Sequence, residues 1–119
     1  MTDRRLIAVV DDDAELRTAV GRVLRAGGFD AVLYGSAEQF LASPPEGRLH
    51  CLVVDVKLGG MSGLDLQRQL RAAGSTVPIV VMTAFETARL KDEAYRLGCA
   101  GVLDKQADID ELLTLIRSF

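Results

Sequence analysis

Several polar residues of this sequence follow directly after short apolar segments, and their side chains suit phosphate and metal chemistry. The apolar segments 6–10, 51–54, 79–82 and 102–103 are followed by Asp11-Asp12-Asp13, Asp55, Thr83 and Asp104-Lys105, respectively. Short, uniformly apolar segments are typical of strands buried on both faces of a parallel sheet. Ligands of such sheets bind beyond the carboxyl ends of the strands. The sequence therefore predicts that carboxylates, a hydroxyl group and an ammonium group meet at one edge of a sheet.

The carboxylates at this predicted edge require a cation. Two carboxylates about 4 Å apart repel each other by about 4 kcal/mol at an effective dielectric constant of about 20, and Asp11, Asp12 and Asp55 would meet this cost more than once. A few carboxylates, a backbone carbonyl and retained water molecules suit Mg²⁺. Alternatively, the run from Asp11 to Asp13 only caps the following helix, but a cap gives no reason for Asp55 at the end of a neighbouring strand. We therefore interpret the cluster as a magnesium site.

A second role is predicted for Asp55. A carboxylate beside a magnesium ion, facing the glycine-rich loop 59–63, is placed to act as a nucleophile toward phosphorus and to form an aspartyl phosphate. Lys105 can neutralise a phosphoryl oxygen, or pair with Asp55 before phosphorylation. Thr83 can donate its hydroxyl to another phosphoryl oxygen. Each residue alone is ordinary, since threonine is common in turns after strands, so the prediction depends on the agreement of four strand ends.

The elements that must position these side chains alternate between strand and helix. Strands are predicted to begin near residues 6, 31, 51, 79 and 101. Five helices are predicted between and after these strands. The first runs from a cap at Asp12 or Asp13 to Gly27-Gly28, and the second from a capping box in 36–39 to the loop 43–47. The third runs from near Leu64 to Gly74, the fourth from Glu86 to Leu97, and the fifth from Asp108 to Ser118. This alternation, repeated five times, predicts an α/β fold with a three-layer αβα open parallel sheet and right-handed crossovers.

The composition predicts one soluble domain that spans residues 1–119. Of the 119 residues, 49% are hydrophobic and 26% are charged, and the net charge of −3 provides no basic field to attract nucleic acid. The longest apolar stretches have about five residues, whereas a membrane helix needs about 20. The N-terminus lacks a signal-peptide pattern. Cys51 and Cys99 are expected to be buried free thiols, which is typical of a cytoplasmic protein without membrane contact.

The order and spacing of these motifs resemble the receiver domain of bacterial two-component response regulators over essentially the whole chain. The matching segments are 9–13, 54–55 with 61–63 downstream, 81–84 and 103–105. Residues 36–41, with the sequence Ser-Ala-Glu-Gln-Phe-Leu, are similar to receivers of the nitrogen-fixation-regulator type. The resemblance implies a flavodoxin-like receiver fold, in which five parallel strands have the order 2-1-3-4-5.

The resemblance also implies a ligand set for Mg²⁺. Asp12 would bind the ion directly, and Asp11 would help, often through a water molecule. Asp55 and the backbone carbonyl of Lys57 would complete the ligands from the protein. Mg²⁺ is therefore the cofactor that we expect.

For phosphoryl transfer, the resemblance implies Asp55 as the acceptor, with Thr83 and Lys105 holding the phosphoryl group. The donor would be a histidine kinase or a phosphotransfer protein, and the recipient of the signal a downstream protein or an output domain. A homodimer formed on phosphorylation is one open mode of response, and direct nucleic-acid contact by this domain is not expected. Such a module catalyses its own phosphorylation but is not an enzyme that turns over a separate substrate. Phe85 and Lys57 occupy positions that influence dephosphorylation in the family, so Phe85 is expected to shield the phosphate from water.

The chain departs from the family pattern at three positions. Most receivers have proline at the positions of Gly59 and Gln106. Loss of proline after Lys105 removes the cis peptide bond usual there, because a non-prolyl cis bond costs about 3 kcal/mol, so Lys105 is expected in a looser loop. The family's switch aromatic falls at Val102, which has no ring to move when Thr83 moves. We expect that the coupling between threonine and aromatic is weakened or rerouted.

Two other functions stay open. The departures at Val102 and Gln106 fit a degenerate receiver that acts as a constitutive protein-interaction domain. A flavodoxin-like cofactor binder or a magnesium-dependent phosphotransferase could use a similar sheet, but Asp11 to Asp13 would repel a nucleotide or flavin phosphate. A phosphotransferase of the haloacid-dehalogenase type would need a second aspartate at Lys57.

Overall fold

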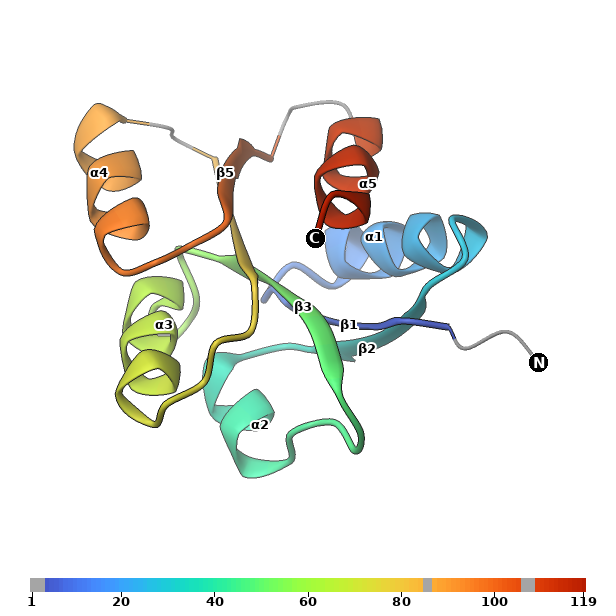
Figure 1. Ribbon diagram of the computed structural model, residues 1–119, viewed down its shortest axis with the longest axis horizontal. Coiled ribbons are helices and arrows are strands. Elements are labelled where there is room, and N and C mark those ends of the chain that lie inside the picture. The colour runs from blue at the N-terminus through green and yellow to red at the C-terminus, as the bar shows by residue number, and fades with distance from the viewer. Residues whose placement is uncertain (1–3, 85–86, 106–108) are drawn as a thin grey trace.

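The computed structural model describes residues 4–84, 87–105 and 109–119, in which strands and helices alternate along the chain (Figure 1). The elements are β1 Leu6–Val10, α1 Ala14–Ala26, β2 Asp30–Tyr34, α2 Ala37–Ala42, β3 Leu49–Asp55, α3 Gly63–Ala72, β4 Ile79–Thr83, α4 Ala88–Arg96, β5 Gly101–Asp104 and α5 Ile109–Arg117. The five strands are parallel and have the order β2-β1-β3-β4-β5. The predicted fold class and strand order are therefore confirmed. Strands β2 and β3 begin one and two residues earlier than predicted.

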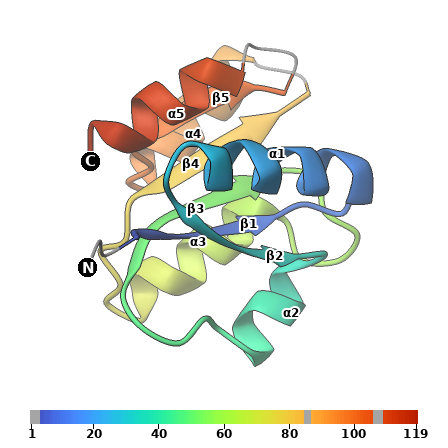
Figure 2. The ribbon, with the colours of Figure 1, turned by 90° about the vertical axis from the view of Figure 1, so that its right-hand side faces the viewer.

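Two apolar layers lie on opposite faces of the sheet. Helices α1 and α5 cover one face and α2, α3 and α4 cover the other (Figures 1 and 2). Successive residues of β1 alternate between the layers, since Ile7 and Val9 belong to the layer of α1 and α5, whereas Ala8 and Val10 belong to the other. Because both faces are covered, β1 and β4 are apolar up to their carboxyl ends, and β3 is apolar between His50 near its start and Asp55 at its end.

Side-chain caps set the starts of the first two helices. The carboxylate of Asp13 accepts hydrogen bonds from the backbone N–H groups of Glu15 and Leu16, so Asp13 caps α1. The Ser36 hydroxyl accepts from the Gln39 N–H at 3.1 Å, which is half of the predicted capping box. The other half differs, because the Gln39 side chain accepts from the Gly35 N–H at 2.9 Å instead of that of Ser36.

Helix α4 is shorter than predicted, and α5 ends at Arg117, one residue before the predicted Ser118. Helix α4 begins at Ala88, because the hydroxyl of Thr87 caps it by accepting from the Leu90 N–H. The described part of α5 runs from Ile109 to Arg117. The predicted starts of these helices, Glu86 and Asp108, lie outside the described residues. The predicted helix ends agree better, since Gly28 and Gly74 have φ angles of 96° and 86°, where a side chain would be strained.

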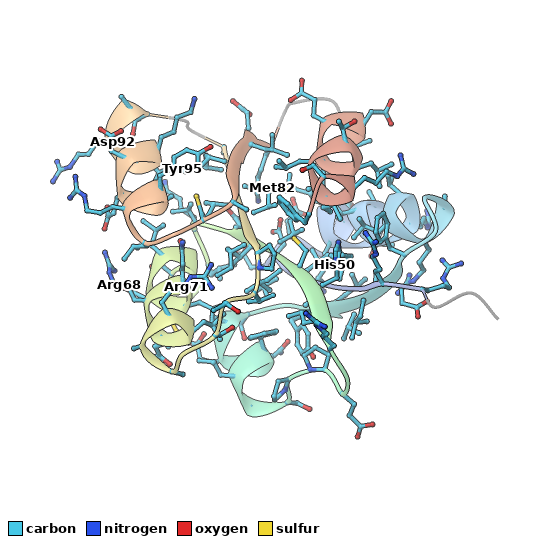
Figure 3. The ribbon with its side chains drawn as sticks, viewed as in Figure 1. His50, Arg68, Arg71, Met82, Asp92 and Tyr95 are labelled. Carbon is cyan, nitrogen blue, oxygen red and sulfur yellow. The ribbon has the colours of Figure 1, made fainter. Side chains whose placement is uncertain are left out.

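Helices α3 and α4, from which Arg68 and Asp92 are labelled in Figure 3, are joined by polar contacts. The Nε2 atom of the fully buried Gln67 donates to the carbonyl of Ala94 at 3.2 Å, whereas its Oε1 atom has no partner among the residues that the structure describes. Arg68 bridges Asp65 on its own helix and Glu93 on α4. A buried amide and a surface ion-pair network thus hold the two helices together.

The two cysteines are free and buried, as predicted. Burial raises the pKa of the Cys51 thiol to about 12, and it also raises the pKa of Cys99. Both thiols are therefore held in their protonated form. Within the part of the chain that the structure describes, every helix is too short or too polar to cross a bilayer.

Candidate functional site

The strand ends bring the predicted site residues together. Val10 of β1 pairs with Val54 of β3, so the residues that follow them, Asp11 and Asp55, lie on neighbouring strands at the same level. Thr83 ends β4 and pairs with Asp104 of β5, which places the following lysine at the same edge. The sheet therefore collects these side chains at its carboxyl edge, as the sequence predicts.

Three carboxylates form the centre of this edge. Asp11, Asp12 and Asp55 each offer one oxygen atom, and these atoms all lie within 4.8 Å of one another. Asp11 and Asp55 are each only 5% exposed, whereas Asp12 is exposed. This combination fits a small divalent cation, because the two buried carboxylates repel each other and the exposed side leaves room for water ligands.

Lys105 lies against the two buried carboxylates. Its Nζ atom is 2.7 Å from Asp55 Oδ2 and 3.2 Å from Asp11 Oδ2. The sequence predicts the pair with Asp55 but not the pair with Asp11. The same argument from neighbouring strand ends could have predicted the second pair, because Asp11 follows the strand next to β3. One ammonium does not offset three carboxylates, so the site keeps an excess of negative charge.

Burial and pairing shift the pKa values of Asp55 and Lys105. Burial raises the pKa of the Asp55 carboxyl, and the charge of Asp11 adds to this rise, while the hydrogen bond and charge of Lys105 oppose it. Burial by itself lowers the pKa of Lys105, but hydrogen bonds to Asp55 and Asp11 and the charges of both outweigh burial and raise it. Lys105 therefore stays cationic, and a further cation at the site would favour the ionised form of Asp55.

The three consecutive aspartates have different tasks. Asp13 caps α1 through its own carboxylate. Asp11 accepts a hydrogen bond from the Asp13 N–H at 2.9 Å, which turns the chain after β1. Asp12 takes part neither in this cap nor in this turn. Capping therefore accounts for one aspartate only, and the other two belong to the carboxylate cluster.

Two further residues support the loops of the site and were not predicted. The guanidinium of Arg17 donates to the backbone carbonyl of Asp11 at 2.6 Å. Glu38 of α2 accepts from the Met61 N–H at 3.1 Å and so ties down the loop after β3. Arg17 lies one helical turn after the cap at Asp13, which is a local signal. Glu38 and Met61 meet only through the fold, and the sequence carries no signal for this contact.

Gly63 permits the chain after Asp55 to fold back. Its N–H donates to the Val56 carbonyl at 3.0 Å, and an added Cβ would lie 2.2 Å from the backbone oxygen of Asp55. A side chain here would displace the backbone of the predicted acceptor. The start of α3 is thus fitted against the end of β3.

The remaining predicted residues are placed as follows. Thr83 is 5% exposed, and its carbonyl accepts from the Lys105 N–H at 2.9 Å. The N–H of Lys57 donates to Asp55 Oδ1 at 3.3 Å, and its side chain is exposed. Val102 is partly buried against the apolar layer of α2, α3 and α4. Phe85 and Gln106 lie outside the described residues.

Comparison with known proteins agrees with this geometry. The family model described as the response regulator receiver domain matches residues 7–117. The transcriptional regulatory protein FixJ of Bradyrhizobium diazoefficiens is 35% identical over 118 residues, which are 99% of this chain and 58% of that protein. The response regulator protein TodT of Pseudomonas putida is 32% identical over 99% of this chain and 52% of its own length. The chain thus spans about half the length of these curated relatives.

Solved structures give the same result. The crystal structure of FixJ-N has a TM-score of 0.87 and 29% identity, and the match covers 98% of this chain and 93% of that one. A response regulator receiver protein from Pseudomonas putida also has a TM-score of 0.87, with 30% identity and full coverage of both chains. The resemblance stated from the motifs is confirmed, including its similarity to the nitrogen-fixation type. This chain belongs to the response regulator receiver domain family of two-component systems.

Proposed function

We propose that this receiver domain takes a phosphoryl group onto Asp55 from a phosphohistidine of a histidine kinase or a phosphotransfer protein. The observation that carries the proposal is the set of charged groups around the buried Asp55 carboxylate. Lys105 Nζ lies 2.7 Å from one of its oxygens, and oxygens of Asp11 and Asp12 lie within 4.8 Å. A buried carboxylate with a cation at one side and a metal-binding cluster at the other is suited to nucleophilic attack on phosphorus.

In the proposed step, an oxygen of Asp55 attacks phosphorus. A P–O bond forms, the P–N bond to the donor imidazole breaks, and its electron pair returns to the imidazole nitrogen. Lys105 exchanges its bond to the carboxylate for a bond to a phosphoryl oxygen, and the Thr83 hydroxyl donates to another. Both groups oppose the negative charge that the phosphoryl group brings into the site.

The carboxylate cluster fits Mg²⁺. Asp11, Asp12, Asp55 and the backbone carbonyl of Lys57 would hold the ion, with water as the other ligands. The ion would supply positive charge that offsets both the carboxylates and the phosphoryl oxygens. The residual negative charge at the site, after Lys105 is counted, supports this assignment.

The rest of the proposal concerns the signal. Residues 1–119 would form a single receiver domain that works in the cytoplasm, where it does not turn over a separate substrate. Phosphorylation would change the face formed by α4 and α5, and so alter contact with a downstream protein, an output domain or a second copy. FixJ is a transcriptional regulatory protein by name, which suggests gene regulation as the outcome, without direct nucleic-acid contact by this domain.

The test uses Mg²⁺ with beryllium fluoride, which mimics a phosphoryl group, and acetyl phosphate as a small donor. We expect amide shifts at residues 55, 83 and 105 in NMR spectra, and a mass increase of one phosphoryl group. Asp55→Asn should abolish both, whereas Asp92→Asn, which removes an exposed carboxylate on α4, should leave both unchanged. Phosphorylation that persists in Asp55→Asn would refute the proposal.

A second candidate is a degenerate receiver that binds its partner constitutively. The observation that favours it is Val102, which lies partly buried against the apolar layer of α2, α3 and α4 and has no ring. In this case Mg²⁺ would bind without beryllium fluoride, and partner affinity would not change with phosphorylation. The same NMR titration separates the two functions.

A further inference from the structure

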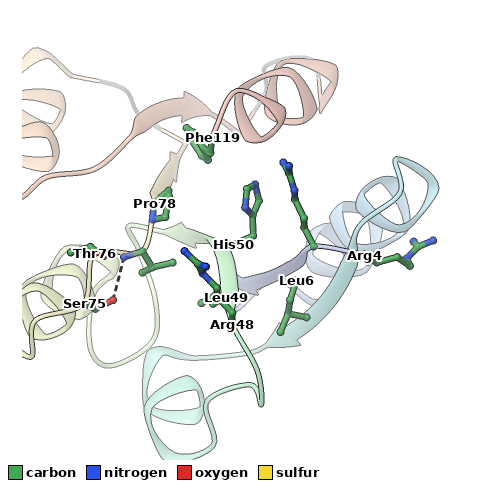
Figure 4. A pocket seen from close by; sticks show the side chains of 11 residues that line it. Arg4, Leu6, Arg48, Leu49, His50, Ser75, Thr76, Pro78 and Phe119 are labelled. Atoms are coloured by element: carbon green, nitrogen blue, oxygen red, sulfur yellow. Dashed lines mark hydrogen bonds between the residues drawn. The ribbon is translucent and has the colours of Figure 1, made fainter. Parts of the chain in front are cut away.

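A groove lies at the amino ends of the strands, opposite to the carboxylate cluster (Figure 4). It is bordered by the start of β1, the start of β3, the loop 75–78 before β4, and the last residue of the chain. Its cavity volume is about 890 Å³, which is in the range of ligand-binding pockets. We call it the amino-end groove.

The polar lining of the amino-end groove is basic. It consists of Arg4, Arg5, Arg48, His50, Ser75 and Thr76. The described residues that line the groove include no aspartate or glutamate. The groove is thus lined by positive charge in a chain whose net charge is −3. Charge complementarity therefore favours an anionic occupant.

One of the three arginines has a structural task. Helices point their carboxyl ends, which carry partial negative charge, toward this end of the sheet. Arg4 donates to the carbonyls of Arg25 and Phe29 and pairs with Asp30 at 3.0 Å. Figure 4 shows its side chain directed away from the groove. Arg4 is therefore explained by the fold.

The other two arginines are not explained in this way. Leu6 pairs with Leu49, so Arg5 and Arg48 come directly before the starts of two neighbouring strands. Among the described residues, neither of these side chains has a hydrogen bond or an ion pair. Both guanidinium groups are exposed, so each can donate a pair of parallel hydrogen bonds to a carboxylate of a ligand.

The other wall and the floor indicate what kind of anion fits. Figure 4 shows Arg48 facing Thr76 across the hollow, with Pro78 and Phe119 beyond. The floor also includes the side chains of Leu49 and Val77. An inorganic anion would leave this apolar surface uncovered. The groove crosses β1, β3 and β4, which span about 10 Å, or about three residues of extended chain.

We propose that the amino-end groove binds a short acidic segment of a partner protein, with carboxylates at Arg5 and Arg48 and an apolar side chain on the floor between Leu49 and Phe119. The partner would thus contact a surface at the far end of the sheet from Asp55. The proposal does not depend on phosphorylation, so either one can fail without the other.

The test is a titration of ¹⁵N-labelled protein with the peptide Ac-Asp-Leu-Glu-Phe-Asp-NH₂ at low salt. Its matched control is the same peptide with amides in place of the carboxylates, and inorganic pyrophosphate is the third ligand. We expect amide shifts at residues 48–50 and 75–77 with the acidic peptide only. Arg5→Gln with Arg48→Gln should weaken binding about tenfold, since each ion pair lost at an exposed guanidinium costs about threefold.

A double variant with the same change in charge serves as the control. Arg22→Gln with Arg89→Gln removes two exposed guanidinium groups outside the groove, and it should change the affinity less than about twofold. An equal loss of affinity for the acidic peptide in both double variants would show that only the net charge of the protein matters, and it would overturn the proposal. Absence of shifts in the groove would do the same. Equal shifts with pyrophosphate would mean a site for inorganic anions and not for a protein segment.

Discussion

Lys105 is the residue on which the charge balance of the carboxylate edge depends. Its ammonium contacts both buried carboxylates, at 2.7 Å from Asp55 and 3.2 Å from Asp11. All three side chains are largely shielded from water, with exposed fractions of 16% for Lys105 and 6% and 7% for the carboxylates. Removal of a partner from such a group leaves uncompensated charge inside the protein.

We predict that Lys105→Met lowers the free energy of unfolding by about 3 kcal/mol in the absence of Mg²⁺, because two buried carboxylates then repel each other without a counterion. Saturating Mg²⁺ should restore most of this loss. Urea unfolding followed by circular dichroism, with EDTA and then with Mg²⁺, measures both effects. Arg22→Met, which removes an exposed charge, is the control and should change little. Equal destabilisation of Lys105→Met with and without the ion would contradict the prediction.

The raised pKa of Asp55 predicts a pH dependence in metal-free protein. The folded state binds this proton more tightly than the unfolded chain, so the group contributes stability below the ordinary carboxyl pKa of about 4. The contribution is lost as the pH rises through the folded value. The stability of the wild type relative to Asp55→Asn should therefore fall as the pH rises above about 4. Urea unfolding in EDTA measures this, and a constant difference across the range would show that the proton is not coupled to folding.

At the scale of elements, the contact between α3 and α4 combines a surface ion pair with a buried amide that is only partly hydrogen-bonded. Arg68 bridges the two helices at the surface, and Gln67 crosses between them inside the core. Within the described part of the chain the amide oxygen of Gln67 has no partner, and an unsatisfied buried polar atom costs about 1–3 kcal/mol. The carbonyl that Gln67 contacts, that of Ala94, also accepts from the Cys99 N–H at 3.1 Å.

Gln67→Met is therefore expected to raise the free energy of unfolding by about 1 kcal/mol. The substitution removes the unpaired oxygen and keeps the shape, while the Ala94 carbonyl retains its bond to Cys99. Thermal and urea unfolding test this, with Gln69→Met on the exposed face of the same helix as the control. A loss of stability in Gln67→Met would mean that the bond to Ala94 outweighs the unpaired oxygen.

The elements also show how far the sequence leads. Strands that end at Asp11, Asp55 and Thr83 were predictable, because buried parallel strands are apolar until they stop. The pairing of Gln39 with Gly35 was not, since the choice between two neighbouring N–H groups depends on the backbone geometry. The contact between Glu38 and Met61 joins residues 23 positions apart, and it exists only because α2 and the loop after β3 pack side by side.

At the scale of the whole molecule, the sheet has ends of opposite charge. The carboxylate cluster occupies the carboxyl edge, and the amino-end groove, which is lined by arginines, lies at the other. Both chain ends that the structure describes lie near the groove, since Arg4 and Phe119 line it. A domain of this kind can meet cationic ligands at one end and acidic ones at the other.

The burial of both thiols makes this protein convenient to label. With a pKa of about 12 for Cys51, a thiol is ionised in about one molecule in ten thousand at pH 8. A maleimide dye should therefore spare both native cysteines for as long as the chain stays folded. Tyr95, which is 53% exposed on α4, can then be replaced by cysteine and tagged selectively. Fluorescence from that single position would report movement of α4 in real time, with no need for a cysteine-free background.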